Sequence, residues 1–478
     1  MRVILIQFDV LEQDAFEVLK LIRSWKNSVA PINRIPPEIL ALLPDFWDEE
    51  YDRDKDVIAL THVCQTWRAV FTSRPSLWTD LGCVDMDKTL IYLKRSKPLP
   101  ISVWLHRAGV WFSHRPFFVV VPQAIERLKS LSVDPGNMQE IIPHLSSPAP
   151  LLRELSVRGC RGAPRQNPVL TSTLFNGDLS SLQKLHLEYI ITELPWRNMV
   201  NLTTLELVNM LQPSIKRLLD FFESAPHLRE VKLHSSSPRN DAQDGRFVSL
   251  RSLKSMCIGG SGWHSPLLDH LLIPVGARLE AKVDLLSPIG NHPQKFIDNL
   301  RNLPDFTSIL LVSGGKLSPR IEFSGPNGQV IISPNYSSPH TPCLSLGSLV
   351  QFDTSKTERL EIIYGSLPAS DSLRQTLLPM RGLCTLVLER CGQPHPFINA
   401  LDPSRCSTGA LVCPKLEELI IECEEEVDIE RVIRMAKARA LRGARLKLVR
   451  IASKDKFCEI GGDGDGGGCG SRGYVATL

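Results

Sequence analysis

Apolar residues recur at helical spacing in residues 1–30. The pattern predicts one amphipathic helix that ends near Asn27. Its apolar side is formed by Phe8, Leu11, Ala15, Val18, Leu19 and Ile22. Such a helix either packs on the helices that follow it or stands free as an arm. The pattern leaves both arrangements open.

Residues 31–82 predict a small helical unit. Pro36 and Pro37 suit a first helical turn, where the missing N–H costs nothing, and Glu38 suits the positive end of the helix. A second helix carries an apolar stripe formed by Val57, Leu60, Val63, Cys64, Trp67 and Phe71. Pro75 ends that helix before Trp78. About fifty residues cannot bury so much apolar surface alone, so the unit is either half of an interface or a helical corner of a larger core.

The pattern changes in the linking segment 83–124. Ile101 to Leu105 (ISVWL) and Pro116 to Val121 (PFFVVV) form clustered apolar runs. Both runs are rich in β-branched and aromatic residues, so both predict strands.

A spaced leucine motif, L-x-x-L-x-L, organises residues 125–456. Its copies begin at Leu152, Leu182, Leu202, Leu228, Leu383 and Leu416. The last two apolar positions of a copy are two residues apart, so they point to the same side of a short strand. One copy cannot bury its apolar face, whereas stacked copies form a continuous core. The motif therefore predicts short parallel strands stacked side by side.

Helical segments separate some of the copies. Residues 214–226 begin with a serine suited to an N-cap, and residues 428–443 begin with an aspartate and end with a glycine. The middle, residues 260–350, is weaker, and we interpret it as degenerate repeats with strands at 282–286, 308–312 and 329–333. Residues 457–478 form a glycine-rich tail that we expect to be flexible.

Three sequence blocks carry a family resemblance. They are IPPEIL (Ile35 to Leu40), THVCQTWR (Thr61 to Arg68) and PSLWTDL (Pro75 to Leu81). Together they resemble the F-box in the form common in mushroom-forming fungi, and residues 88–105 resemble the stretch that follows it there. The chain departs from that pattern at Ile35, where the family usually has leucine, and in an acidic stretch at 44–56. The later motif copies resemble irregular leucine-rich repeats.

The resemblance implies an α plus α/β chain in which a small helical F-box precedes an irregular leucine-rich-repeat solenoid. It also implies a substrate-recruiting subunit of a Skp–cullin–RING ubiquitin ligase, whose F-box binds the Skp-type adaptor and whose repeats bind an unknown target protein. By motif position, the adaptor-binding residues are Pro36, Ile39, Leu40, Leu60, Val63, Cys64, Trp67, Leu77 and Trp78. Outward-pointing strand residues offer target-binding candidates, namely Arg158, Lys184, His186, Glu206, Lys232, Glu389 and Glu422.

A second function fits the same pattern. The helical start could serve as the N-terminal cap of a repeat scaffold outside any ligase, because solenoids need their first open core face covered. The two functions differ in exposure. A cap buries Trp67 and Trp78 within the chain, whereas an adaptor-binding unit leaves part of its apolar face available.

Composition narrows the function classes. The net charge of +3 favours neither nucleic acid nor an acidic substrate as a partner. The 12 cysteines include no C-x-x-C pair, which favours reduced thiols in the cytoplasm or nucleus. No apolar run reaches transmembrane length, and the first residues carry acids too early for a signal peptide. We therefore expect no membrane partner.

Catalytic signals are sparse in the sequence. No G-x-S-x-G, H-E-x-x-H or zinc-ligand spacing is present. His62 and Cys64 are two residues apart on a predicted helix and so face different directions, while Cys391 is expected in the core. We expect neither an enzyme nor a cofactor or metal site. An acidic run at 417–430 followed by a basic run at 431–456 predicts a solvated, ion-paired face or, alternatively, a charged docking patch.

Overall fold

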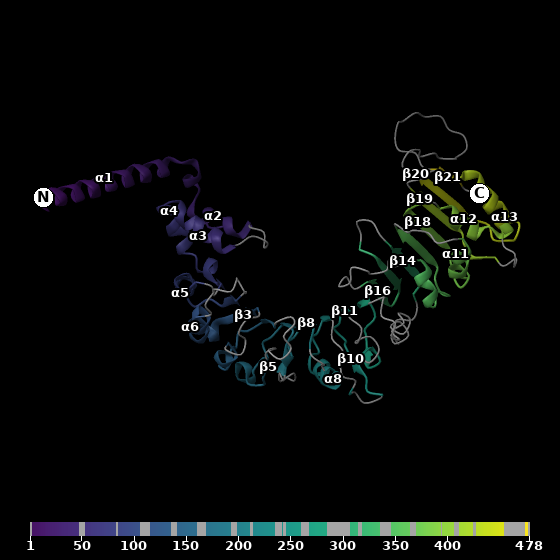
Figure 1. The fold of residues 1–478 in the computed structure, drawn as a ribbon, viewed down its shortest axis with the longest axis horizontal. Helices are drawn as coiled ribbons and strands as arrows, with labels where there is room; N and C mark the ends of the chain where they lie inside the picture. Colours follow the sequence, from purple (N-terminus) through teal and green to yellow (C-terminus); the bar gives the residue numbers. More distant parts are fainter. Residues whose placement is uncertain are drawn as a thin grey trace. The chain divides into compact units, whose positions relative to one another are not determined.

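The chain divides into two compact units in a computed structural model (Figure 1). The N-terminal unit comprises Met1–Leu185 with Ile190–Asn198, and the C-terminal unit comprises His186–Tyr189 with Met199–Leu478. The structure describes residues 2–46, 53–82, 85–105, 115–134, 141–159, 169–192, 198–210, 214–234, 241, 245–259, 267–283, 306–313, 318–334, 346–363, 370–392, 394–405, 411–423, 427–453 and 474–476.

The N-terminal unit begins with helices. They are α1 (Arg2–Val29), α2 (Pro37–Leu40), α3 (Arg53–Val63) and α4 (Gln65–Thr72), with 3₁₀ turns at Pro31–Arg34, Leu43–Phe46 and Pro75–Trp78. Helix α1 ends two residues beyond the predicted Asn27 and forms one long rod (Figure 1). Almost all its described side chains, from Leu11 onward, are exposed. The helix therefore stands free instead of packing on α2–α4.

The helix predicted across Val57 to Phe71 is wrong as a single helix. Its backbone breaks at Cys64, which is extended (φ −159°, ψ 177°) and precedes the first residue of α4. The apolar spacing survives the break because Leu60 of α3 and Trp67 and Phe71 of α4 pack in one small core. Arg68 Nε donates to the Thr61 carbonyl at 2.9 Å and so satisfies one acceptor at the end of α3.

Parallel strands with connecting helices follow in the N-terminal unit. β1 (Asp80–Gly82), β2 (Ile101–Leu105), β3 (Leu128–Val133) and β4 (Glu154–Arg158) pair in that order, all parallel. Helices α5 (Met86–Arg95) and α6 (Arg115–Ala124) connect the first three. Short strands β5 (Val169–Leu170) and β7 (Ile191–Thr192) form a separate pair, and β6 (Lys184–Glu188) crosses the boundary of the two units.

The prediction of a strand at 116–121 is wrong, because these residues lie in α6. Phe117, Val120, Val121 and Ala124 are buried while Val119 is exposed, which is the spacing of one helical face. A short run of apolar residues fits a strand or a buried helix equally well, so the sequence alone could not separate them. The strand predicted at Ile101 to Leu105 is confirmed as β2.

The C-terminal unit contains a long, mostly parallel strand ladder. Its order is β8 (Thr204–Val208), β9 (Glu230–His234), β11 (Ser255–Gly259), β13 (Arg278–Val283), β16 (Gly328–Pro334), β15 (Arg320–Gly325), β14 (Ser308–Val312), β17 (Arg359–Ile363), β18 (Thr385–Cys391), β19 (Glu418–Cys423), β20 (Leu448–Ser453) and β21 (Tyr474–Ala476). Among the described strand pairs of this ladder, those that involve β15 or β21 are antiparallel and the others are parallel. Strands β10 (Val248–Ser249) and β12 (Leu271–Leu272) pair separately.

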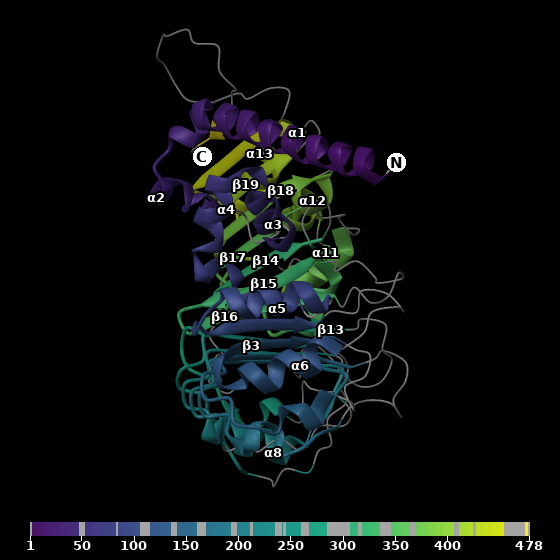
Figure 2. The ribbon, with the colours of Figure 1, turned by 90° about the vertical axis from the view of Figure 1, so that its left-hand side faces the viewer.

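Helices accompany this ladder. They are α8 (Ile215–Ser224), α11 (Ser370–Leu377), α12 (His395–Leu401) and α13 (Ile429–Ala440). Figures 1 and 2 show α11, α12 and α13 along one side of strands β14–β20. Two predicted caps are confirmed, since Ser214 accepts from the Arg217 N–H and Asp428 from the Arg431 N–H. The chain thus alternates helices with a mostly parallel sheet.

The leucine motif forms strands at all six predicted copies. Neighbouring copies pair in matching register, as when Leu205 lies beside Val231 and Leu207 beside Leu233. The matched positions are buried, so each copy extends the same apolar row. Because of this register, the two apolar residues that lie two positions apart in each motif are correctly predicted to be buried.

The middle of the chain departs from simple stacking. The strands predicted at 308–312 and 329–333 are confirmed as β14 and within β16, while residues 284–286 of the third lie outside the described residues. Antiparallel β15 separates β14 from β16, and Gly325 pairs with Gly328 across a two-residue turn. Gly328 adopts φ 146°, a conformation that a Cβ disfavours.

The glycine-rich tail also differs from expectation at its end. Tyr474–Ala476 pairs antiparallel with β20, so these residues are not free. Of the described helices, none has the length and apolar character needed to cross a lipid bilayer.

Candidate functional site

A compact core supports the helical segment 31–82. Leu40, Trp67 and Phe71 are buried together, and Leu60 and Cys64 pack against them half-buried. The Trp67 and Phe71 rings meet edge to face, 5.7 Å between centroids. Trp67 Nε1 donates to Asn33 Oδ1 at 2.6 Å, so the indole polar group is satisfied. The core therefore fixes α2 against α4.

Trp78 joins this segment to the strand-bearing part of the same unit. It is only 1% exposed, and its Nε1 donates to the Phe71 carbonyl at 3.0 Å. Its ring meets Tyr92 of α5 edge to face at 4.8 Å, and the Arg95 guanidinium lies 4.3 Å from its centroid. Trp78 is thus an internal connector.

Burial corrects part of the predicted adaptor-binding set. Leu40, Trp67 and Trp78 are buried, so they cannot touch a partner directly and instead hold the surface in place. Motif position identifies apolar residues but does not say which side of a helix faces inward. The remaining predicted residues, Pro36, Ile39, Leu60, Val63, Cys64 and Leu77, are exposed or half-buried.

Exposed apolar side chains remain on the helical segment. Ile39 is 54% exposed and Val63 is 52% exposed. Sequence reasoning missed three further exposed residues, Ile32, Leu42 and Phe46. The signal for Leu42 was available, because it lies three positions after Ile39 and so on the same side of a helical turn. We call Ile32, Pro36, Ile39, Leu42 and Val63 the helical apolar set.

A salt bridge fixes the backbone beneath this set. Arg74 Nη2 lies 2.8 Å from Asp45 Oδ2 and 2.9 Å from Asp45 Oδ1, and Arg74 Nη1 donates to the Ala41 carbonyl. The end of α4 is thereby tied to the turn after α2. One guanidinium thus holds two partners at once, the Asp45 carboxylate through Nη2 and the Ala41 carbonyl through Nη1. The turn that carries Leu42 is therefore held in place between Ala41 and Asp45.

The predicted target-binding residues do not form one site. Arg158 and Lys184 belong to the N-terminal unit, where they pair with Asp134 at 3.4 Å and Glu154 at 2.8 Å. In the C-terminal unit, Glu389 and Glu422 are register neighbours on β18 and β19. The remaining three residues, His186, Glu206 and Lys232, lie together.

That group forms a charged cluster on the strand face. Glu206 Oε2 lies 3.3 Å from His186 Nδ1 and 3.8 Å from Lys232 Nζ. The hydrogen bond with His186 is the largest cause that lowers the pKa of Glu206. The register continues the row from Lys232 to Cys257 and Glu280. A surface of alternating charges suits a polar protein partner more than an apolar one.

A glycine makes room for a histidine beside this cluster. Gly259 pairs with His234 in the ladder, and a Cβ added at Gly259 would lie 2.5 Å from His234 Nδ1. The imidazole therefore lies over the glycine backbone. Burial is the first cause that lowers the pKa of His234, and the nearby Lys282 charge lowers it further.

We expect Gly259→Ala to raise the pKa of His234 toward its ordinary value. The new methyl group displaces the imidazole from its half-buried position, and burial is the main cause of the lowered pKa. Histidine-selective NMR titration measures the midpoint. Gly392→Ala is the matched control, because a Cβ there meets nothing within 4 Å. An unchanged His234 midpoint in Gly259→Ala would contradict burial as the cause.

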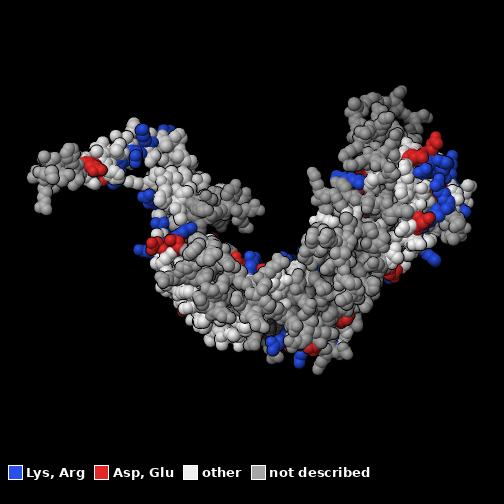
Figure 3. Space-filling model, in the orientation of Figure 1, with Lys and Arg blue, Asp and Glu red and all other residues white. Residues whose placement is uncertain are grey.

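The charge runs near the C-terminal end are partly paired. Lys447 Nζ lies 2.7 Å from Glu417 Oε2, and Arg431 Nε lies 3.7 Å from Asp428 Oδ2. Figure 3 shows the basic side chains of this region gathered in one area of the surface. The exposed ones on and after α13 are Arg434, Lys437, Arg442, Arg445, Lys447 and Arg450.

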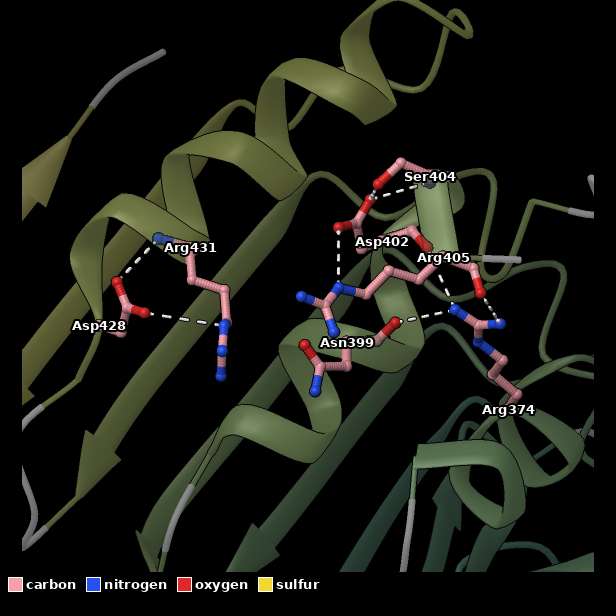
Figure 4. A network of polar contacts seen from close by, with 7 residues as sticks. All are labelled: Arg374, Asn399, Asp402, Ser404, Arg405, Asp428 and Arg431. Carbon is pink, nitrogen blue, oxygen red and sulfur yellow. Dashed lines mark hydrogen bonds and ion pairs between the residues drawn. The ribbon is translucent and has the colours of Figure 1, made fainter. Parts of the chain in front are cut away.

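Arginines also act inside this region. Arg374 donates to the carbonyls of Asn399 at 2.9 Å, Arg405 at 3.0 Å and Asp402 at 3.2 Å (Figure 4). Asp402 Oδ1 accepts from the Ser404 N–H and hydroxyl. These bonds satisfy carbonyls at the end of α12, so this polar network has a structural role.

Three described cysteines are held in unreactive surroundings. Burial raises the pKa of Cys413 to about 12 and that of Cys257 to about 11, so neither is a thiolate at neutral pH. Cys391 is buried, as predicted, and donates to the Ile362 carbonyl at 3.4 Å. No grouping of three or more His, Cys, Asp or Glu side chains suited to a metal ion occurs among the described residues.

Comparison with known proteins adds no family. No protein-family model matches the chain, and no curated protein matches it significantly. Function is therefore argued from the sequence motifs and the geometry of the helical apolar set.

Proposed function

We propose that the chain is a substrate-recruiting F-box subunit of a Skp–cullin–RING ubiquitin ligase. Residues 31–82 bind the Skp-type adaptor, and residues 125–456 form an irregular leucine-rich-repeat solenoid that binds a target protein. In this proposal the chain acts by binding. The observation that carries the proposal is the exposure of Ile39 and Val63 on helices whose other residues, Leu40 and Leu60 among them, pack in the small core.

The exposure pattern supports an interface over a simple cap. A cap needs only the inward side of the helices, and Trp78 fills that role against Tyr92. Ile39 and Val63 contribute nothing to that packing, yet each leaves about half of its surface in water. A partner that covers them would recover transfer free energy of about 1 kcal/mol or more for each side chain.

The alternative is a repeat scaffold with a helical N-terminal cap, outside any ligase. The burial of both Trp67 and Trp78 favours it, because these residues were the ones expected to distinguish the two functions. The two roles use different sides of the same helices. A binding experiment on the exposed side therefore separates them.

We expect Ile39→Asp with Val63→Asp to abolish adaptor binding by the full-length chain. Two carboxylates in a closely packed apolar interface cost several kcal/mol, so the affinity falls by about a hundredfold or more. Pull-down against the Skp-type adaptor of the organism that encodes the chain measures it. Both side chains are exposed, so the fold survives, whereas a charge at buried Leu40 would unfold the segment.

The matched control is Val275→Asp with Val350→Asp. Both valines are exposed to a similar degree but lie in the C-terminal unit. Adaptor binding that survives in the control and is lost in Ile39→Asp/Val63→Asp supports the proposal. A wild-type chain that is folded, as circular dichroism reports, and yet does not bind the adaptor would leave the capped scaffold as the function.

A further inference from the structure

Helix α1 carries an apolar stripe that the described residues of its own unit leave uncovered. Its described side chains at three- and four-residue steps are Leu11, Ala15, Val18, Ile22, Trp25 and Val29. All are exposed, and Trp25 is 67% exposed. Steps that alternate four and three are the heptad pattern of a coiled coil, in which two such stripes pack together. The helix therefore has the form of half a coiled coil.

Charge divides the same helix into two halves. Glu12, Asp14 and Glu17 precede the middle of the described part, while Lys20, Arg23 and Lys26 follow it. Figure 3 shows the acidic atoms of α1 nearer its N-terminus and the basic atoms nearer its C-terminus. Two parallel copies would place like charges beside each other. Two antiparallel copies place each acidic half against a basic half, which is the complementary arrangement.

We propose that α1 pairs antiparallel with α1 of a second copy of this chain. In the register that places Glu12 beside Lys26 of the second copy, large residues meet small ones. Ala15 then faces Trp25, Val18 faces Ile22, and Leu11 faces Val29. Core layers that alternate large and small side chains fill space better than matched pairs do.

The parallel alternative packs poorly. It places Trp25 against Trp25 in one layer and Ala15 against Ala15 in another, so one layer is overfilled and one is underfilled.

The antiparallel register also brings Leu19 beside Leu19 and Leu21 beside Leu21 of the second copy. These two leucines flank the heptad stripe and are exposed in the single chain, so the pairing covers them as well.

The length of the helix limits the affinity. The described stripe spans residues 11–29, fewer than three heptads. Short coiled coils of this size are marginal, so we expect a monomer–dimer equilibrium with a Kd of about 1–100 µM. Analytical ultracentrifugation of the full-length chain across that range measures it.

Val18→Glu with Ile22→Glu tests the interface. Both positions lie in the central layers, and we expect the dimer to weaken at least about a hundredfold. Phe16→Glu is the matched control. Phe16 is equally exposed on the same helix but lies off the stripe, so its loss leaves the Kd unchanged within about threefold. A dimer that survives Val18→Glu/Ile22→Glu, or one that Phe16→Glu disrupts equally, overturns the proposal.

Charge reversal tests the direction of pairing. Glu12→Lys and Lys26→Glu each create two like-charge contacts in the antiparallel dimer, so each weakens it by about tenfold. The double variant restores opposite charges and returns the Kd to within about threefold of the wild type. In a parallel dimer these residues lie about 21 Å apart along the axis, and the double variant would rescue nothing.

Two results overturn the proposal directly. One is a wild-type chain that remains monomeric up to about 200 µM, well above the expected range. The other is a monomeric chain that co-sediments with vesicles of phosphatidylcholine and phosphatidylserine through α1, since the stripe would then be a membrane-binding face. Concentration-dependent dimerisation with rescue by the charge swap supports the antiparallel pair.

Discussion

Trp78→Ala is expected to destabilise the N-terminal unit by about 3–5 kcal/mol. Trp78 is fully enclosed, and its removal leaves a cavity between the helical segment and α5. The Phe71 carbonyl loses the shorter of its two hydrogen bonds and keeps the one from the Arg74 N–H at 3.4 Å. The Tyr92 and Arg95 contacts are lost as well. Because a domain is stabilised by about 5–15 kcal/mol in total, the loss is a large fraction of its stability.

Hydrogen exchange of the full-length chain localises this effect. We expect faster exchange in α4, in the turn Pro75–Trp78 and in α5, with little change in the C-terminal unit. Phe46→Ala is the matched truncation, because Phe46 is an aromatic residue of the same segment that is 80% exposed. It should cost about 0.5 kcal/mol or less. Equal protection loss in both variants would show that Trp78 does not connect the two parts.

Trp78→Phe separates the two contributions. It keeps an aromatic ring in the site but removes the donor to the Phe71 carbonyl. The carbonyl keeps the Arg74 N–H at 3.4 Å, so the change removes one hydrogen bond, worth about 0.5–1.5 kcal/mol. We therefore expect an intermediate loss of stability, measured by urea unfolding. A Phe variant as stable as the wild type would mean that ring packing alone carries the site.

Strand positions were predictable because the repeat motif encodes them directly. Two apolar residues with one polar residue between them, as in Leu205 and Leu207, fit only a strand with one buried face. Capping residues were equally predictable, since Ser214 and Asp428 each precede a segment in which apolar residues recur at helical spacing. These signals are local. They do not depend on what lies across the sheet.

Elements that depend on distant contacts were not predictable. The run of apolar residues at 116–121 becomes α6 because buried residues recur along one face of it, which the sequence cannot reveal. The break at Cys64 likewise preserves the apolar spacing of one continuous helix. Strand β15 runs antiparallel to both of its neighbours and is joined to β16 by a two-residue turn. Its place between β14 and β16 depends on contacts across the sheet, which the sequence does not give.

The candidate site was only partly predictable from the sequence for the same reason. Motif position marks Leu40 and Ile39 equally, yet one is buried and the other exposed. Adjacent residues on a short helix point in different directions, and the core decides which one turns inward. The sequence therefore identifies the segment that we propose as the binding segment, while the packing identifies the side chains that remain available for contact.

Arg439→Met is expected to destabilise the C-terminal unit by about 2–4 kcal/mol. Arg439 is completely buried, and its guanidinium donates to the carbonyls of Val412 at 2.8 Å and Cys413 at 2.7 Å. Methionine fills much of the space but donates nothing, so the Val412 and Cys413 carbonyls lose hydrogen bonds from a charged donor, which are worth about 1.5–3 kcal/mol each. The Cys413 carbonyl still accepts from the Leu416 N–H at 3.1 Å. Removing a buried charge offsets part of that cost. Burial lowers the pKa of Arg439, yet arginine remains charged.

Backbone strain makes this position matter more than an ordinary hydrogen bond. Cys413 has φ 47°, a left-handed conformation that a non-glycine residue rarely adopts. Arg439 holds the carbonyls of this turn from α13, so its loss releases the strained segment. Circular dichroism during urea unfolding measures the stability, and hydrogen exchange at residues 411–416 localises the change.

Arg434→Met is the matched control, because it makes the same chemical change at an exposed position. It makes the same substitution in α13, where Arg434 is exposed, and arginine and methionine have similar helix propensity. The control should change stability by about 0.5 kcal/mol or less. If the two variants unfold at the same urea concentration, the guanidinium of Arg439 does not hold the turn. If only Arg439→Met unfolds at a lower urea concentration, the buried guanidinium joins α13 to the turn before β19. It does so by donating to the backbone carbonyls of Val412 and Cys413 in that turn.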